Sequence, residues 1–127
     1  MKRLETYFEL DFKDKDLLKT ALTHSSYANE NNCPSNERLE YVGDAVLDLL
    51  MGEYLYITYP LNNEGDLTKK RAKNVCESAL VEYAKECNLK KYLRLGKGEE
   101  KSGGRDRTAL QADAFEALIG AVYMDKG

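Results

Sequence analysis

Two groups of acidic residues have the spacing of a metal-binding or acid–base site. Glu37, Glu40 and Asp44 fall at positions i, i+3 and i+7 of a segment with helical periodicity, so their side chains share one stripe of a helix. Asp113 and Glu116 repeat the i, i+3 spacing near the end of the sequence. Such carboxylates can bind a divalent cation, although a single acidic stripe is as often a solvated helix face.

The second group has the more informative surroundings. Apart from Asp113 and Glu116, the segment 112–123 is almost wholly apolar, so the helix that it predicts must be largely buried. A buried carboxylate is costly unless it is paired or bound to a metal, and this segment contains no Lys or Arg. Hard cations such as Mg²⁺ prefer oxygen ligands and accept phosphate oxygens as additional ones. If the two acidic stripes face each other, they predict metal-dependent hydrolysis of a phosphate ester.

The sequence lacks the residues that other hydrolytic mechanisms require. His24 is the only histidine, which excludes a two-histidine nuclease and an H-E-x-x-H zinc site and leaves a Ser-His-Asp triad without support. We expect His24 and Ser25 to form local hydrogen bonds at a helix end. The three cysteines show no C-x-x-C pairing and are interpreted as reduced residues without a metal.

The elements that carry these residues are predicted to be helices. Proline occurs only at positions 34 and 60, and alternating strand patterns are absent. The expected helices cover residues 14–28, 37–59 and 67–87, and a final helix starts at Thr108. The helix over 67–87 is expected to be broken near Asn74. Asp66 is the expected N-cap of the third helix, and Thr108 forms a capping box with Gln111. Residues 95–104 are expected to form a glycine-rich mobile loop.

The long helix has an apolar arc opposite its acids, which we expect to anchor it to the rest of the domain. The residues of this arc are Leu39, Val42, Val46, Leu49 and Leu50.

Composition favours one globular domain. The chain has 127 residues, of which 43% are hydrophobic and 32% charged. No apolar run approaches the length of a membrane helix and the first residues are charged, so a cytoplasmic protein without a membrane partner is expected. The net charge of −3 disfavours nucleic acid as a partner unless the acids gather at a metal site. Basic residues that could contact phosphates are Lys69, Lys70, Arg71, Lys73, Lys97, Lys101, Arg105 and Arg107.

Residues 36–47, Asn-Glu-Arg-Leu-Glu-Tyr-Val-Gly-Asp-Ala-Val-Leu, resemble the signature segment of the ribonuclease III family. Four further segments resemble family motifs in the same order: ALTHSSY at 21–27, EGDLT at 64–68, KSGG at 101–104 and ADAFEALIG at 112–120. The resemblance implies an all-α ribonuclease III endonuclease domain over residues 1–127. Bacterial members usually continue into a double-stranded-RNA-binding domain, so we expect this chain alone to bind RNA weakly and with a steep salt dependence.

The resemblance implies a homodimer that cuts both strands of double-stranded RNA in RNA processing, such as rRNA precursor maturation, and leaves 5′-phosphate and 3′-hydroxyl ends. The implied cofactor is Mg²⁺, with Mn²⁺ as a substitute. The positions that match the family's metal ligands are Glu40, Asp44, Asp113 and Glu116, with Asp44 and Glu116 as catalytic residues. Glu37 and Glu64 match acids that engage RNA or lie in the outer shell, and Tyr41 matches an aromatic residue that inserts into the second subunit.

Two other functions fit the same residues. One is a noncatalytic double-stranded-RNA-binding or assembly module on the same fold, which the retention of buried acids disfavours because such a module gains nothing from them. The other is hydrolysis of a small phosphorylated substrate such as a nucleotide. It predicts turnover without dimer formation.

Overall fold

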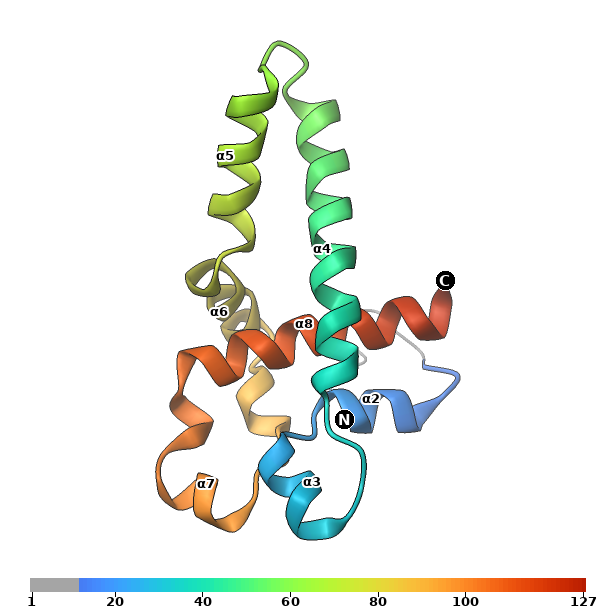
Figure 1. The fold of residues 1–127 in the computed structure, drawn as a ribbon, viewed down its shortest axis with the longest axis vertical. Helices are drawn as coiled ribbons and strands as arrows, with labels where there is room; N and C mark the ends of the chain where they lie inside the picture. Colours follow the sequence, from blue (N-terminus) through green and yellow to red (C-terminus); the bar gives the residue numbers. More distant parts are fainter. Residues whose placement is uncertain (1–11) are drawn as a thin grey trace.

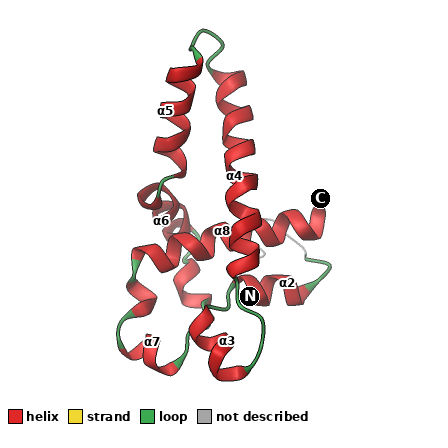
Figure 2. Ribbon diagram, in the orientation of Figure 1, coloured by secondary structure: helices red, strands yellow, loops and turns green. Residues whose placement is uncertain are grey.

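The computed structural model describes residues 12–127, which form an all-α fold (Figures 1 and 2). The charged first residues lie outside this range. The α-helices are α2 (Lys15–Ala21), α3 (Ser25–Asn31), α4 (Glu37–Thr58), α5 (Glu64–Val75), α6 (Glu77–Glu86), α7 (Lys97–Lys101) and α8 (Thr108–Lys126). Two 3₁₀ turns are η1 (Leu89–Tyr92) and η2 (Gly104–Asp106). Among these residues, the β pairing is one isolated bridge between Thr23 and Arg94. The predicted all-α fold is confirmed.

Helix α8 is the centre of the domain. It packs against α2, α4 and α6, and its buried residues, many of them alanines, lie on every side of the helix. Leu118 is 1% exposed, and Leu18 of α2 is completely buried in the same core. Helices α4 and α5 lie side by side as an arm that projects away from this core (Figure 1). The prediction of a buried last helix is therefore confirmed.

The long helix has its predicted extent, but its apolar arc is only partly buried, contrary to expectation. Helix α4 ends at Thr58, shortly before Pro60, as the proline predicts. Of its apolar arc, however, Leu39 is buried, whereas Leu49 is 69% and Leu50 54% exposed. The part of α4 that packs against α8 is centred on Leu39 and Gly43. Helical periodicity identifies an apolar face, but it does not say which surface covers that face.

The single helix predicted over residues 14–28 is two helices. Helix α2 ends at Ala21, and α3 begins at Ser25. Between them the backbone turns away to pair with another segment, since the amide of His24 donates to the carbonyl oxygen of Arg94 at 3.0 Å. His24 then caps α3 by accepting a hydrogen bond from the Ser26 amide, so a helix-end role for His24 is confirmed, with Ser26 as its partner.

The predicted break in the segment 67–87 is also confirmed, because α5 and α6 meet at Cys76. The expected N-cap was wrong. Helix α5 begins at Glu64, three residues earlier than expected, and its N-cap is Asn63, whose side chain accepts from the Asp66 amide at 2.8 Å. Asp66 lies in the first turn, where an acid is also favourable.

Residues 95–104 contain a helix and not an unstructured loop. Helix α7 is held by ion pairs from Arg105 to Glu100 and from Arg107 to Glu99. The predicted capping box of α8 is absent, since the Thr108 hydroxyl donates to Glu77 at 2.8 Å. Arg107 occupies the N-cap position. Among the helices of residues 12–127, none combines the length and apolar character that a membrane span requires.

Candidate metal centre

Helices α4 and α8 cross at two glycines. A Cβ atom on Gly43 would overlap the carbonyl oxygen of Glu116, and one on Gly120 would overlap the carbonyl oxygen of Leu39. Each glycine therefore lets the backbone of one helix touch that of the other. Gly43 lies between Glu40 and Asp44 in the sequence, so the closest point of the crossing is also the point where the two acidic stripes meet.

Three of the predicted ligands form a tight group at this crossing. Glu40 from α4 and Asp113 and Glu116 from α8 each offer a carboxylate oxygen, and these oxygens lie within 4.8 Å of one another. The i, i+3 spacing places both α8 acids on the side of the helix that faces α4. The arrangement brings together residues more than 70 positions apart in the sequence.

Burial and repulsion oppose the full ionisation of this group. Burial, followed by the charge of Asp113, raises the pKa of Glu40 from 4.5 to about 7. Burial and then the neighbouring Asp44 raise the pKa of Glu116 from 4.5 to about 8. Burial also raises the pKa of Asp113. Each raised pKa means that a further negative charge is unfavourable at this place.

The group fits a hard divalent cation. Within residues 12–127, no Lys or Arg side chain favours the ionisation of these three acids. Carboxylate oxygens are the ligands that Mg²⁺ and Mn²⁺ prefer, and a divalent charge would offset the repulsion. The donor set and its excess negative charge therefore match such an ion.

Asp44 and Glu37 flank the group on α4. Asp44 is near enough to Glu116 to raise its pKa, but it is outside the set of three oxygens. Glu37, one turn before Glu40, raises the pKa of Glu40 by its charge and accepts a hydrogen bond from the Ser35 hydroxyl at 3.4 Å. Both predicted residues are thus at the edge of the cluster.

Glu64 lies apart from the cluster in the same chain. It starts α5 and lines a hollow with Gly52, Leu55 and Arg71 on the arm. At about 1.5 Å per residue, the α4 residues that line this hollow are roughly 20 Å along the helix from Glu40. Glu64 could therefore act near a cation held by Glu40 only through a bound molecule, or if that Glu40 belongs to a second copy of the chain.

Tyr41 stands on the exposed arc of α4, with 81% of its surface exposed. Beside it lies an apolar cavity of about 560 Å³ between α4 and the end of α8. Its lining includes Tyr41, Val46, Leu49, Ile119 and Val122. An exposed ring next to an apolar cavity is typical of a surface that another protein covers.

Two residues near the centre, Gly43 and Glu77, were not predicted from the sequence. Gly43 could have been noticed, since a glycine between two acids of one helix often marks a close approach. Glu77 starts α6 and is near enough for its charge to raise the pKa of Asp113. No sequence pattern linked Glu77 to the site.

Comparison with known proteins agrees with this arrangement. The profile of the family described as Ribonuclease-III-like matches residues 14–127. The chain is 58% identical over 120 residues to ribonuclease 3 of Listeria monocytogenes serotype 4a, which covers 92% of this chain and 52% of the relative. Ribonuclease 3 of Streptococcus pneumoniae serotype 19F is 53% identical over 133 residues, covering 99% of this chain and 57% of the relative. The chain thus spans about half the length of these relatives.

Solved structures have the same fold. The nuclease domain of ribonuclease III from Campylobacter jejuni superposes with a TM-score of 0.93 at 42% identity, covering all of this chain and 84% of the other. Another structure of that domain concerns flexibility in a region involved in its dimer formation. Dicer from Pichia stipitis is similar with a TM-score of 0.68 at 29% identity, over 92% of this chain and 48% of its own. The chain belongs to the ribonuclease-III-like family.

Proposed function

We propose that residues 1–127 form the nuclease domain of an endoribonuclease that hydrolyses double-stranded RNA with Mg²⁺, leaving 5′-phosphate and 3′-hydroxyl ends. The observation that carries this proposal is the convergence of Glu40, Asp113 and Glu116 within 4.8 Å. Membership of the ribonuclease-III-like family supports the substrate class. Natural substrates would include structured precursors such as those of rRNA, in the cytoplasm.

Each acid has a defined task in this proposal. Glu40, Asp113 and Glu116 hold the cation, and Mn²⁺ can replace Mg²⁺ because both take oxygen ligands. Asp44 lies beside Glu116 and adds a further oxygen at the edge of the group. The bound ion supplies Lewis-acid stabilisation of the phosphate and a more acidic water. Glu37 and Glu64 contact RNA or the hydration shell around the site.

The domain acts as a homodimer in this proposal, with Tyr41 inserted into the second subunit. Support comes from the exposed ring of Tyr41 and from the apolar cavity next to it. Two copies would bring two carboxylate clusters to one RNA duplex, one for each strand. A duplex cut on both strands requires two such sites.

The test is a substrate panel with purified protein. Long duplex RNA, single-stranded RNA of the same sequence and a mononucleotide are incubated at low salt with Mg²⁺ or with EDTA. The proposal expects cleavage of the duplex alone, in the presence of Mg²⁺ alone, with 5′-phosphate ends. Binding is measured in parallel by electrophoretic mobility shift.

The other outcomes identify the alternatives. Duplex binding without cleavage in Mg²⁺ would identify a noncatalytic RNA-binding module. Turnover of the mononucleotide, with the duplex intact, would identify a hydrolase of small phosphorylated substrates. Either result would overturn the proposed activity.

A further inference from the structure

Helix α5 is loosely attached along its length. In the described range 12–127, no residue of α5 is buried, and the helix contacts mainly α4 and α6. Between α4 and α5 lies a hollow of about 510 Å³, whose lining includes Gly52, Leu55, Leu67 and Arg71. A Cβ atom on Gly52 would lie 3.9 Å from an Arg71 nitrogen, its nearest neighbour in the part of the chain that the structure describes. Close packing of the two helices therefore does not by itself fix the rotation of α5 about its own axis.

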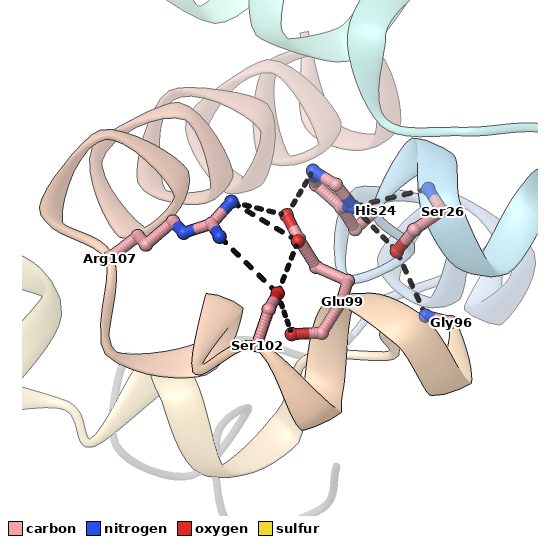
Figure 3. A network of polar contacts seen from close by, with 6 residues as sticks. All are labelled: His24, Ser26, Gly96, Glu99, Ser102 and Arg107. Carbon is pink, nitrogen blue, oxygen red and sulfur yellow. Dashed lines mark hydrogen bonds and ion pairs between the residues drawn. The ribbon is translucent and has the colours of Figure 1, made fainter.

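The opposite end of the domain is connected by a network of polar contacts (Figure 3). There the carboxylate of Glu99 in α7 accepts hydrogen bonds from Arg107 and from the Ser102 hydroxyl, and the Ser26 hydroxyl accepts from the Gly96 amide at 2.8 Å. These contacts join α3 and α7 to the start of α8. In contrast, two polar side-chain contacts join α5 to other elements within residues 12–127.

The first of these two contacts lies towards the tip of the arm. The ammonium group of Lys70 lies 4.4 Å from the centre of the Tyr59 ring, at the end of α4. Asn74, one turn further along α5, donates from its side-chain Nδ2 to the carbonyl oxygen of Lys70 at 2.7 Å. Tyr59 is 40% exposed, and a cation over an exposed ring is only weakly attracted to it. This contact alone does not hold α5 in one orientation.

The second contact lies at the base of the arm, where α5 and α6 meet. Cys76 has an extended backbone, with a ψ of 167°, so the helical hydrogen bonds of α5 end before it. The last carbonyl groups of a helix have no partner within that helix. One of them is the carbonyl of Asn74, which accepts a hydrogen bond from the Tyr83 hydroxyl of α6 at 2.9 Å. Tyr83 therefore caps the end of α5.

The ring of Tyr83 is itself anchored to the core. It packs against Phe115 of α8, with the ring centres 5.7 Å apart and the ring planes tilted by 47°. Phe115 is 7% exposed, so the side chains around it hold it in place. Tyr83 thus connects the end of α5 to the central helix through a hydrogen bond that needs its hydroxyl and a contact that needs only its ring.

We infer that Tyr83 is a positioning residue for the arm: its hydroxyl sets the rotation of α5 and with it the direction of Glu64, ten positions before Asn74. A side chain on a helix reaches about 6 Å from the axis, so a rotation of α5 by about 20° would move the Glu64 carboxylate by about 2 Å. A displacement of about 1 Å can lower the rate of an enzyme about 100-fold. The inference rests on the proposed function, in which Glu64 contacts RNA or the hydration shell around the site.

The test compares Tyr83→Phe with the wild type. The variant keeps the ring that packs on Phe115 and removes only the hydroxyl. The rate of duplex RNA cleavage at saturating protein is expected to fall about fivefold, which corresponds to the loss of one hydrogen bond of ordinary net strength. The matched control is Tyr92→Phe, because Tyr92 also packs partly buried against the core but lies in η1, outside the arm. The control is expected to cleave like the wild type.

Mn²⁺ binding shows whether the effect bypasses the metal centre. Phe115 lies between Asp113 and Glu116 in α8, so a change at Tyr83 could in principle reach these acids. Since the ring stays in place in Tyr83→Phe, its Mn²⁺ affinity without RNA is expected to remain within about twofold of the wild-type value. Isothermal titration calorimetry measures it. Weaker Mn²⁺ binding by the folded variant would overturn the inference, because Tyr83 would then act on the metal centre.

Hydrogen exchange tests the attachment of α5 directly. In Tyr83→Phe the amides in the last turn of α5 are expected to exchange about fivefold faster, because the helix end has lost its cap. The amides of α4 are expected to exchange as in the wild type. Unchanged exchange in α5 would overturn the inference, whatever the cleavage rate.

A double variant tests whether Tyr83 acts through Glu64. In the Glu64→Gln background, Tyr83→Phe is expected to cause no further loss of cleavage, since the carboxylate whose direction it sets is already gone. A merely structural role of Tyr83 would lower the rate by the same factor in both backgrounds. That result would overturn the inference.

The outcomes separate this inference from the proposed function. A wild-type protein that leaves duplex RNA intact in Mg²⁺ would overturn the proposed function, and hydrogen exchange would still report whether the Tyr83 hydroxyl holds α5. A wild type that cleaves duplex RNA, with Tyr83→Phe cleaving it equally fast, would overturn only the positioning role of Tyr83.

Discussion

Gly43 of α4 lies directly against the carbonyl oxygen of Glu116 in α8, with no room for a Cβ atom between the two backbones. The same contact sets the spacing of Glu40, Asp113 and Glu116, because all three are within one turn of it. A direct contact between two helix backbones and a group of three carboxylates are therefore at one place.

Replacing Gly43 by alanine is expected to separate α4 from α8. The added methyl must displace backbone, so we expect a loss of about 2 kcal/mol or more in the free energy of unfolding, together with loss of cleavage. The matched control is Gly52→Ala in the same helix, where the new Cβ would meet only an Arg71 nitrogen at 3.9 Å. This control should be neutral or slightly stabilising, because alanine favours helix. Urea unfolding measures both variants, and equal stabilities would contradict the close crossing.

Glu116→Gln is expected to abolish cleavage without unfolding the domain. The amide keeps the shape of the side chain but removes a charge that burial and Asp44 disfavour. The melting temperature without metal should therefore equal or exceed that of the wild type, while Mn²⁺ binding is lost. The control is Glu82→Gln, an acid of α6 with 71% side-chain exposure, which should behave like the wild type. An unfolded Glu116→Gln variant would contradict the assignment of Glu116 to the metal site.

Stability without metal is expected to fall as the pH rises from about 4.5 to about 8. The folded pKa values of Glu40 and Glu116, about 7 and about 8, exceed the ordinary value of 4.5, so the folded protein binds more protons than the unfolded chain in this range. Their contribution is complete below 4.5 and is lost as each acid ionises. Thermal melts in EDTA measure this dependence. Saturating Mg²⁺ and the Glu116→Gln variant should each flatten it, and a stability that rises with pH would contradict the shifts.

Tyr41→Ala is expected to weaken self-association without affecting the fold. Aromatic residues at the centre of an interface often contribute at least 2 kcal/mol to binding, so the dimer Kd should rise about 30-fold. Tyr54→Ala is the control, because Tyr54 is also exposed on α4 but does not line the cavity beside Tyr41. Sedimentation equilibrium distinguishes the two variants. A dimer that Tyr41→Ala leaves intact would exclude this residue from the interface.

Glu64→Gln is expected to separate metal binding from cleavage. Because Glu64 lies on the arm, away from the Glu40 cluster of its own chain, Mn²⁺ affinity in the absence of RNA should stay within about twofold of the wild-type value. Cleavage of duplex RNA should decrease. Glu40→Gln is the comparison and should lose both. Weaker Mn²⁺ binding by Glu64→Gln would show that Glu64 is a ligand.

The sequence alone determined the local features of this protein. The stripe of Glu37, Glu40 and Asp44 requires only helical periodicity, and the end of α4 requires only Pro60. The burial of α8 follows from its apolar composition, and the cost of placing Asp113 and Glu116 on such a helix indicates a cation. The order of family motifs supplied Glu64 and Tyr41, which periodicity could not single out.

The tertiary structure decided which faces meet. The apolar arc of α4 was expected to be buried within the domain, yet Leu49 and Leu50 are exposed, since an amphipathic pattern does not identify the partner that covers it. The break before α3 and the helix at 97–101 depend on contacts such as Glu30 to the Lys97 amide, across 67 positions. Such contacts leave no periodic trace in a sequence, because each needs only two residues brought together by the whole fold.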